Sequence, residues 1–277
     1  MNHQPFSVAM SVYKNDNASF FDRALESITE IQTVKPNEIV LVVDGPVPNE
    51  INRVINKYLK KFNFKVIRLE TNAGLGNALK IAIENCSFEL VARMDSDDVS
   101  AYNRFEQQLL FFSREPHIDI IGGDISEFID SENNIISYRN VPMSHTRIKS
   151  FIKKSCPLNH VTVMFKKTSV INAGGYLDWH YNEDYYLWIR MYLNNCVFAN
   201  TGTVLVNVRS GLDQFARRGG WKYYQSERML QTFMLSKRMI SFPRYLINCS
   251  KRFIIQVMLP NRIRGWLYMH RGKKPND

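Results

Sequence analysis

Three carboxylates, Asp95, Asp97 and Asp98, follow an apolar run within four positions. Like charges this close repel one another, so such a cluster is stable where water solvates it fully or where a cation neutralises it. Residues 88–94 have the composition of a buried strand, which places the cluster at a strand's carboxyl end, where open α/β sheets bind ligands. The spacing fits a divalent-metal site that serves a phosphorylated substrate and a solvated acidic turn equally well.

The elements that must position this cluster alternate between strand and helix. Strands are predicted at residues 6–13, 38–43, 64–69 and 88–94, with helices between them; Ser19 is the predicted N-cap of the first helix. Alternation at this spacing indicates right-handed crossovers and a parallel sheet. The carboxyl ends of its strands then bring residues 11–15, Asp44 and the acidic cluster to one edge, which is the candidate site.

The second half of the chain has a mixed pattern. Strands are expected at residues 118–123, 127–129, 161–165, 196–199 and 203–208, and helices at 103–112, 144–153 and 168–172. Asn182 is the expected N-cap of a further helix that begins with Glu183 and Asp184. From Gly211 onward the sequence becomes basic, aromatic and helical.

Composition restricts the class of protein. A chain of 277 residues, 45% hydrophobic, is long enough for one large core or for a core domain with a smaller appendage. Its four cysteines are far apart and contain no CxxC pair, which favours a reducing compartment. No export leader is evident, and no window reaches the roughly 18 uncharged apolar residues of a membrane-spanning helix, so a cytoplasmic location is expected. Most of the net charge of +10 lies between Lys237 and Asp277, where ten Lys and Arg residues face one acid.

Several short motifs occur in a characteristic order over roughly residues 6–210. They are Met10-Ser11-Val12-Tyr13-Lys14-Asn15, Val43-Asp44-Gly45, Asn72-Ala73-Gly74-Leu75-Gly76-Asn77-Ala78, Asp95-Ser96-Asp97-Asp98, Ala173-Gly174-Gly175-Tyr176, and Glu183-Asp184 followed by Leu187-Trp188. In this order the chain resembles the inverting glycosyltransferases of family 2, and in particular the bacterial enzymes that build polysaccharide repeat units. The resemblance implies the α/β GT-A fold, with a mostly parallel central sheet flanked by helices.

The resemblance also implies how the donor, a UDP-sugar, is bound. Asp44 should accept a hydrogen bond from the uracil N3–H, although a plain turn-forming role before Gly45 is the alternative. Asp97 should ligate Mn²⁺ or Mg²⁺ between the two phosphates, and Asp95 should face the ribose or the metal's water shell. The remaining donor-nucleotide contacts are expected from Ser11, Tyr13 and Asn77.

The acidic pair Glu183-Asp184 corresponds to the family's carboxylates beside the acceptor. One of them should be the general base that takes the proton of the attacking hydroxyl, and we assign this role to Asp184. Acids in the first turn of a helix are also favoured by the helix dipole whatever the function, so the choice between the two stays open. Weaker candidates for contacts with the acceptor or the diphosphate are His160, Arg217 and Arg218.

The predicted function is therefore transfer of one hexose or N-acetylhexosamine, with glucose or galactose favoured, to a polyprenyl-diphosphate-linked saccharide during O-antigen or capsule assembly. Addition of a single sugar is expected because the Gln-x-x-Arg-Trp element of processive family members is missing. Residues 1–210 should form the catalytic domain, with a donor half up to about residue 100 and an acceptor half beyond it.

Residues 211–277 should form a basic amphipathic helical extension. Basic and aromatic residues on a helix too short to span a membrane suit an anionic membrane surface, so peripheral attachment to the inner face of the cell membrane is expected. Nucleic acid is not expected as a partner, and the sequence does not indicate an oligomeric state. The competing hypotheses are a nucleotidyltransferase on a similar fold and a non-enzymatic module that binds membrane or nucleic acid.

Overall fold

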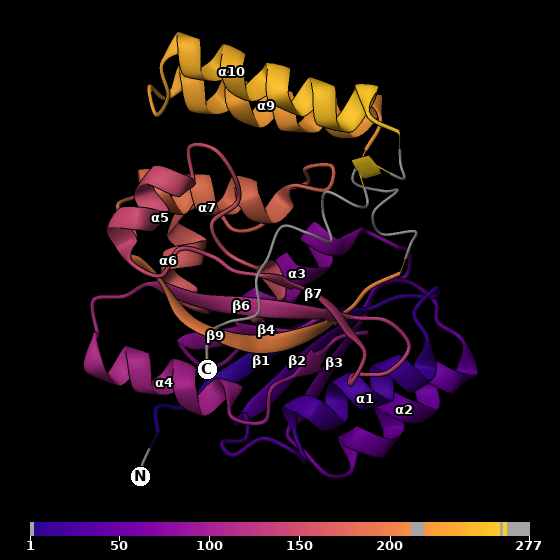
Figure 1. Cartoon of the computed structure of the whole chain (residues 1–277). Helices are drawn as coiled ribbons and strands as arrows, with labels where there is room; N and C mark the ends of the chain where they lie inside the picture. Colours follow the sequence, from indigo (N-terminus) through magenta and orange to yellow (C-terminus); the bar gives the residue numbers. More distant parts are fainter. Residues whose placement is uncertain (1–2, 212–218, 261–262, 265–277) are drawn as a thin grey trace.

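One mixed sheet of nine strands forms the centre of the protein (Figure 1). The computed structural model describes residues 3–211, 219–260 and 263–264. The strands are β1 (Phe6–Val12), β2 (Glu38–Val43), β3 (Phe64–Arg68), β4 (Leu90–Arg93), β5 (Val99–Ser100), β6 (Ile120–Phe128), β7 (Ile135–Arg139), β8 (Met164–Lys166) and β9 (Phe198–Arg209). The helices are α1 (Ala18–Ile28), α2 (Asn49–Leu59), α3 (Leu75–Glu84), α4 (Arg104–Arg114), α5 (His145–Phe151), α6 (Lys167–Asn172), α7 (Glu183–Leu193), α9 (Trp221–Ser236) and α10 (Phe242–Phe253), with a 3₁₀ turn η1 (His160–Thr162) and a π-helical turn η2 (Ile254–Met258).

The first four strands are parallel, as predicted. They lie in the order β3-β2-β1-β4, and Ser11 of β1 is in register with Val42 of β2. Every residue of β2 is buried, which explains its unbroken apolar sequence, because both faces of a parallel strand are covered by helices. The carboxyl ends of β1, β2 and β4 therefore share one edge of the sheet.

The second half adds antiparallel strands to this frame. β8 pairs antiparallel with both β4 and β6, while β6 pairs parallel with β9 and antiparallel with β7. The short strand β5 pairs antiparallel with β9 at the far edge. This continuation makes the sheet mixed and brings the second half of the chain to the same edge as the first half.

Two hydrophobic cores cover the two faces of the sheet. Helices α1, α2 and α4 pack on one face, and α3, α5, α6 and α7 on the other, as Figure 1 shows. In α2 the buried residues are Ile51, Ile55 and Tyr58, at the spacing that places side chains on one side of a helix. Trp188 of α7 is fully buried in the second core.

Four local predictions need correction. The N-cap of α1 is Asn17, whose Oδ1 accepts hydrogen bonds from the backbone N–H groups of Ser19 (2.9 Å) and Phe20 (3.3 Å), so Ser19 is not the cap. Asn182 is at the N-cap position of α7, as predicted, but its side chain makes no capping hydrogen bond, and its amide donates to Ser226 Oγ of α9 at 3.0 Å instead. The strand expected to begin at Val161 begins at Met164, after the η1 turn.

The fourth correction concerns strand continuity. Residues 118–123 and 127–129 belong to one strand, β6, and residues 196–199 and 203–208 to another, β9. The apolar pattern is interrupted at Asp124 because this buried carboxylate accepts hydrogen bonds from Asn140 Nδ2 (2.8 Å) and Val141 N (2.9 Å). Remote donors thus let a polar residue occupy the centre of a strand.

Helices α9 and α10 form a hairpin beside α7 and α5, at the top of Figure 1. Leu230 and Met234 of α9 are fully buried in the second core. Asn248 of α10 donates to Lys153 O at 2.9 Å, and Arg252 donates to Lys154 O at 3.0 Å. The hairpin therefore packs against the preceding part of the chain, residues 3–211.

Candidate active site

The shared edge of the parallel strands opens into a cavity of about 540 Å³. Its lining comes from the ends of β1, β2 and β4, from the loop before α3, and from two tyrosines of the second half. These residues are Ser11, Tyr13, Asp16, Asp44, Asn72, Gly74, Leu75, Asp95, Ser96, Asp97, Asp98, Tyr181, Val208 and Tyr223. Five of the predicted donor-site residues (Ser11, Tyr13, Asp44, Asp95, Asp97) are thus brought together here, and we refer to this space as the donor cavity.

Asp44 anchors the loop that forms one wall of the donor cavity. Its carboxylate accepts hydrogen bonds from Ala73 N (2.6 Å), Gly74 N (3.0 Å) and Asn72 Nδ2 (2.9 Å). Gly45, which follows, has φ +86°, and a Cβ there would lie 2.9 Å from Asn72 N, so this close approach requires glycine. A carboxylate has about four acceptor positions, which leaves Asp44 one for a further donor.

The three acids of the cluster have different environments. Asp95 forms a two-pronged ion pair with the guanidinium of Arg93, which is 3% exposed and lies beneath the cavity. Asp98 is buried, and its carboxylate accepts a hydrogen bond from Arg209 N at 2.9 Å, which joins the cluster to the end of β9. Burial and its two acidic neighbours hold the pKa of Asp98 well above its usual range. Asp98 therefore has a structural role that the sequence did not indicate.

Asp97 is the acid without such a partner. Within the described residues its carboxylate accepts no hydrogen bond from another residue. Burial first, and then the charges of Asp95 and Asp16, raise the pKa of Asp97 to about 6. A cation at this position would compensate both the desolvation of the Asp97 carboxylate and its repulsion by Asp95 and Asp16.

The residues present fit a magnesium- or manganese-type site. In the described ranges 3–211, 219–260 and 263–264, no group of three His, Cys, Asp or Glu side chains comes together to hold a metal alone. Mg²⁺ typically binds one or two carboxylates and completes its coordination with water and substrate phosphates. One uncommitted carboxylate, Asp97, beside a second acid, Asp95, is the donor set that such an ion requires.

Asp16 is a donor-cavity residue that the sequence analysis missed. Its carboxylate accepts hydrogen bonds from Tyr13 N (3.0 Å) and Ser96 Oγ (2.9 Å), so it ties the loop after β1 to the acidic cluster. Burial raises the pKa of Asp16 above its usual value. Its position just beyond a strand's carboxyl end was the signal that could have identified it.

Two predicted site residues do not line the donor cavity. The Asn77 side chain is exposed and donates back to Ala73 O at 2.9 Å, at the start of α3. His160 Nε2 lies 2.6 Å from Tyr176 Oη, and its ring packs at the edge of Trp188 with centroids 6.1 Å apart. Burial and the nearby Arg93 charge lower the pKa of His160 well below its usual range, so it is a neutral packing residue.

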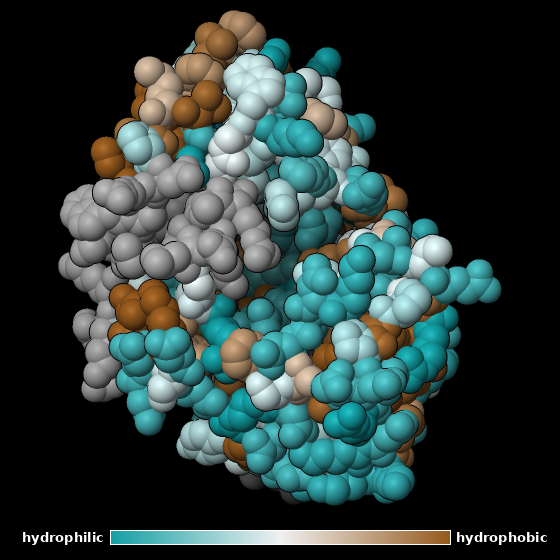
Figure 2. All heavy atoms as spheres, turned by 90° about the vertical axis from the view of Figure 1, so that its right-hand side faces the viewer, coloured by the Kyte–Doolittle hydropathy of each residue, from teal (hydrophilic) through white to brown (hydrophobic). Residues whose placement is uncertain are grey.

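A second cavity of about 620 Å³ adjoins the first, and we refer to it as the acceptor cavity. It lies between the catalytic half and the α9–α10 hairpin, and Figure 2 shows this face hollowed below the hairpin. Its lining residues are Glu127, Tyr138, Arg139, Asn140, Val141, Phe151, Lys154, Ser155, Cys156, Tyr181, Asn182, Asp184, Tyr185, Tyr223, Glu227, Lys251, Arg252, Ile255 and Gln256. Tyr181 and Tyr223 line both cavities, with ring centroids 6.2 Å apart, so the two spaces meet at this pair.

Asp184 lines the acceptor cavity, whereas the side chain of its neighbour Glu183 lies near Gly76 at the start of α3. The Asp184 carboxylate accepts a hydrogen bond from Tyr185 N at 2.7 Å, and Cys156 Sγ lies 3.7 Å from its Oδ2. Burial raises the pKa of Asp184, and burial with the charge of Asp184 raises the pKa of Glu183 to about 7. Both carboxyl groups have a raised pKa, which suits a general base, but of the two only Asp184 lines the cavity, and this supports Asp184 over Glu183.

Cys156, Arg139 and Lys251 were also missed. They are distant from one another in the sequence and line the same cavity as Asp184, so no local motif could identify them. Arg217 and Arg218, expected at the donor diphosphate, lie outside the described residues.

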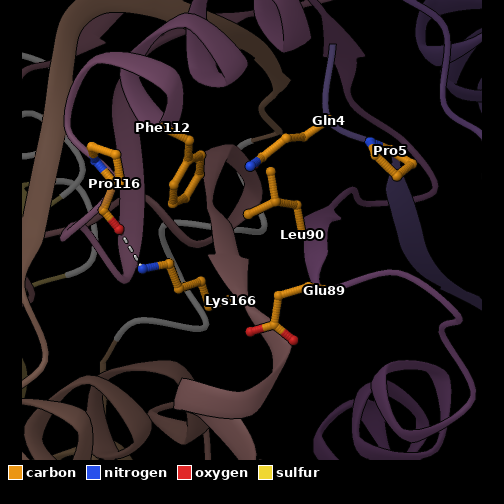
Figure 3. A pocket seen from close by; sticks show the side chains of 7 residues that line it. All are labelled: Gln4, Pro5, Glu89, Leu90, Phe112, Pro116 and Lys166. Atoms are coloured by element: carbon orange, nitrogen blue, oxygen red, sulfur yellow. Dashed lines mark hydrogen bonds between the residues drawn. The ribbon is translucent and has the colours of Figure 1, made fainter. Parts of the chain in front are cut away.

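A third cavity, of about 290 Å³, lies at the opposite edge of the sheet, before β1 and β4 (Figure 3). It is lined by apolar side chains such as Leu90 and Phe112, and Lys166 closes one side by donating to Pro116 O at 2.6 Å. Amino ends of parallel strands are not the edge at which α/β sheets bind ligands. This cavity is therefore unrelated to the acidic site.

Comparison with known proteins identifies the family of this chain. Residues 7–174 match the model for "Glycosyl transferase family 2", which covers more than half of the chain. This chain belongs to glycosyl transferase family 2. It is therefore a glycosyltransferase, and the nucleotidyltransferase and non-enzymatic hypotheses are set aside.

Relatives of this family 2 enzyme include two with named pathways. A UDP-Gal:α-D-GlcNAc-diphosphoundecaprenol β-1,3-galactosyltransferase of Escherichia coli is 36% identical over 95% of this chain and 94% of its own length. An amylovoran biosynthesis glycosyltransferase of Erwinia amylovora is 35% identical over 95% of this chain and 97% of its own. Similarity thus extends through the α9–α10 hairpin, beyond the part that the family model matches.

Solved structures support the GT-A fold. Staphylococcus aureus TarS (residues 1–349, in complex with UDP-GlcNAc) superposes with a TM-score of 0.66 at 19% identity, over 91% of this chain and 73% of that one. A Pyrobaculum calidifontis mannosyltransferase in complex with GDP-Man and Mn²⁺ superposes with a TM-score of 0.62 at 12% identity, over 99% of this chain and 77% of that one. At these identities the likeness establishes the fold alone.

Proposed function

We propose that this family 2 enzyme is an inverting, metal-dependent hexosyltransferase that moves one sugar, with galactose favoured, from a UDP-sugar to an N-acetylhexosamine linked by diphosphate to a polyprenyl lipid. The observation that carries the proposal is the junction of two cavities, one holding the unpartnered Asp97 and the other Asp184. The 36% identity to the galactosyltransferase, over nearly all of both chains, supports the choice of sugar and acceptor.

On the donor side, the nucleotide lies against the ends of β1 and β2. Asp44 has one acceptor position left for the uracil N3–H, and Ser11 and Tyr13 line the same wall. Asp97, with Asp95 beside it, would hold Mn²⁺ or Mg²⁺. When bound, this ion neutralises the charge that develops on the departing diphosphate.

On the acceptor side, Asp184 removes the proton of the attacking hydroxyl. The hydroxyl oxygen forms a bond to the anomeric carbon while the bond from that carbon to the diphosphate oxygen breaks. UDP leaves with the bonding electrons, and Asp184 keeps the proton. Attack from the side opposite the diphosphate inverts the anomeric configuration, which is why the base and the donor diphosphate belong in different cavities.

An exposed apolar stripe on α10 and η2 supports attachment to a membrane surface. Its members are 47% to 64% exposed: Phe242, Leu246, Ile247, Ile254 and Met258. Hydrophobic atoms gather at the hairpin end of the molecule in Figure 2. Within the described residues, no helix is long and apolar enough to cross a bilayer.

Cations accompany this stripe. Arg244 and Lys251 on α10 and Lys237 and Arg238 just before it are exposed. An exposed apolar face with basic neighbours binds anionic lipid surfaces, and each cation near such a surface contributes about 1 kcal/mol. We therefore propose that residues 1–210 form the catalytic domain and residues 211–277 its attachment to the cytoplasmic membrane face.

The decisive experiment supplies purified protein and Mn²⁺ with UDP-galactose, UDP-glucose and the two UDP-N-acetylhexosamines. The acceptor is a synthetic N-acetylglucosaminyl diphosphate with a lipid chain, and the product is identified by mass and by NMR of the new linkage. A single added galactose in β-linkage is the expected product. Transfer with retained configuration, or no transfer from any UDP-sugar, would refute the proposal.

A further inference from the structure

The acceptor cavity has basic side chains where the loop after α5 meets the hairpin. Lys154, in the loop after α5, and Lys251, on α10, line it, and Arg139 of β7 lines it as well. Both lysines are exposed, and neither takes part in an ion pair within the described part of the chain. Cations that line a cavity without acidic partners favour an anionic ligand.

The neighbouring Arg252 differs from these three cations. It is paired with Glu227 of α9, so its charge is already compensated. Its Nη2 also donates to Lys154 O at 3.0 Å, which fixes the backbone of the loop relative to α10. Arg252 therefore ties the backbone of Lys154 to α10 next to Lys251, and it leaves the charges of both lysines available.

Lys251 also marks the border between the cavity and the apolar stripe. On the same helical side, Ile247 lies four residues before it, Ile254 three residues after it and Met258 seven residues after it. Residues at these spacings are neighbours on a helix surface. All three are strongly exposed, whereas Ile255, on the other side of Lys251, lines the cavity.

The apolar stripe adjoins Lys251 on the surface of α10, and Lys251, Lys154 and Asp184 line one cavity. A polyprenyl-diphosphate sugar has parts that match these groups: an apolar chain in the membrane, a diphosphate at its surface, and a sugar beyond it.

We propose that Lys154 and Lys251, assisted by Arg139, form the subsite that binds the diphosphate of the lipid-linked acceptor. The inference rests on the proposed function and adds to it a second diphosphate site, separate from the donor's. The subsite sets how far the acceptor sugar reaches from the membrane, and so places its hydroxyl at Asp184.

Lysine suits this role because its ammonium is a compact charge on a flexible stem that can follow a diphosphate at a mobile membrane surface. Hydrogen bonds to charged groups are worth more than neutral ones, and loss of one such bond corresponds to about a 10- to 100-fold loss of affinity. Two lysines can thus distinguish a diphosphate-linked sugar from the same sugar without phosphates.

The test compares two soluble acceptors without any vesicle, so that membrane attachment is not measured. One is an N-acetylglucosaminyl diphosphate with a short alkyl chain, and the other is the alkyl N-acetylglucosaminide without phosphates. For Lys154→Gln and Lys251→Gln, the KM for the diphosphate acceptor should rise about 10- to 100-fold relative to the KM for the alkyl glycoside. Lys251→Arg should restore much of the loss.

Lys149→Gln is the matched control. Lys149 is an exposed lysine on α5, the helix before the loop that contains Lys154, and it does not line the cavity. The substitution should leave both KM values unchanged. Thermal unfolding and UDP binding report whether each variant keeps its fold and its donor site.

The outcomes separate this inference from the proposed function. Equal changes of KM for both acceptors, or no change in either variant, would overturn the subsite while the transferase activity stands. A wild-type enzyme with the same KM for both acceptors would also overturn the subsite, because the diphosphate would then contribute nothing to acceptor binding. Absence of transfer by the wild type to both acceptors would instead refute the proposed function itself.

Discussion

Glu183 is a half-buried carboxyl that forms no ion pair within the described residues, and its replacement by glutamine should stabilise the protein in a pH-dependent way. Burial is the main cause that raises its pKa, from 4.5 to about 7, and the charge of Asp184 adds to it. A tenfold change in an acid dissociation constant corresponds to about 1.4 kcal/mol, so the ionised Glu183 lowers the free energy of unfolding by on the order of 3 kcal/mol.

The sign follows from proton binding. Between pH 4.5 and 7 the unfolded chain loses the Glu183 proton while the folded protein keeps it, so the unfolded state binds fewer protons and stability falls as pH rises. Below pH 4.5 both states are protonated, and the Glu183→Gln variant should match the wild type. Above pH 7 the variant should be more stable by the full amount.

Urea unfolding at pH 4.5, 6 and 8, with EDTA present to keep metal away from Asp97, measures this difference. Asp178→Asn is the control, because Asp178 is an exposed carboxyl of the same segment and should give no pH-dependent difference. A Glu183→Gln effect of the same size at pH 4.5 and pH 8 would refute the reasoning, since it would arise from packing and not from charge.

Three further substitutions test the catalytic site and one tests the membrane surface. Asp97→Asn should reduce kcat by about 100-fold or more and abolish the effect of Mn²⁺ on UDP binding by calorimetry; a retained Mn²⁺ effect would place the metal elsewhere. Asp184→Asn should lower kcat by about 10²- to 10⁴-fold with unchanged UDP affinity, and a fully active variant would exclude it as the base. Asp44→Ala removes the hydrogen bonds that the carboxylate accepts from residues 72–74 and should cost about 1–3 kcal/mol in urea unfolding, whereas an unchanged midpoint would contradict its anchoring role. Leu246→Glu should weaken sedimentation with anionic vesicles by about 10-fold but not change turnover of a short-chain acceptor; equal vesicle binding would argue against the α10 stripe.

Much of the donor half could be predicted from the sequence. Each of the first four strands is a short apolar run that ends at polar residues, and chain order alone makes such strands parallel with a common carboxyl edge. The strand pattern therefore predicts that Ser11, Asp44 and Asp97 lie near one another. The family motifs then supplied their roles, because each role belongs to a local stretch of chain.

The bounds of β6 and β9 were predicted wrongly because a polar residue interrupts the apolar pattern of each strand, and its hydrogen-bond partners are distant in the sequence. Asp124 lies in the centre of β6 because Asn140 and Val141 donate to it. Asn200 lies within β9 because its amide donates to Pro142 O (2.7 Å) and Pro157 O (3.1 Å). Periodicity in one strand carries no information about such partners, so each strand was predicted as two pieces.

Only the tertiary structure decided what surrounds each acid. In the folded protein Asp95 pairs with Arg93, and the Asp98 carboxylate accepts a hydrogen bond from Arg209 N. The half-buried Asp97 carboxylate accepts no hydrogen bond from another described residue. The physical reason is that desolvation and long-range charge pairs depend on distances in space, which residue types and spacing do not record. The sequence by itself determined that the site of a family 2 glycosyltransferase lies at this edge, and folding determined which carboxylate receives no hydrogen bond from another described residue and that Lys154 and Lys251 line one cavity.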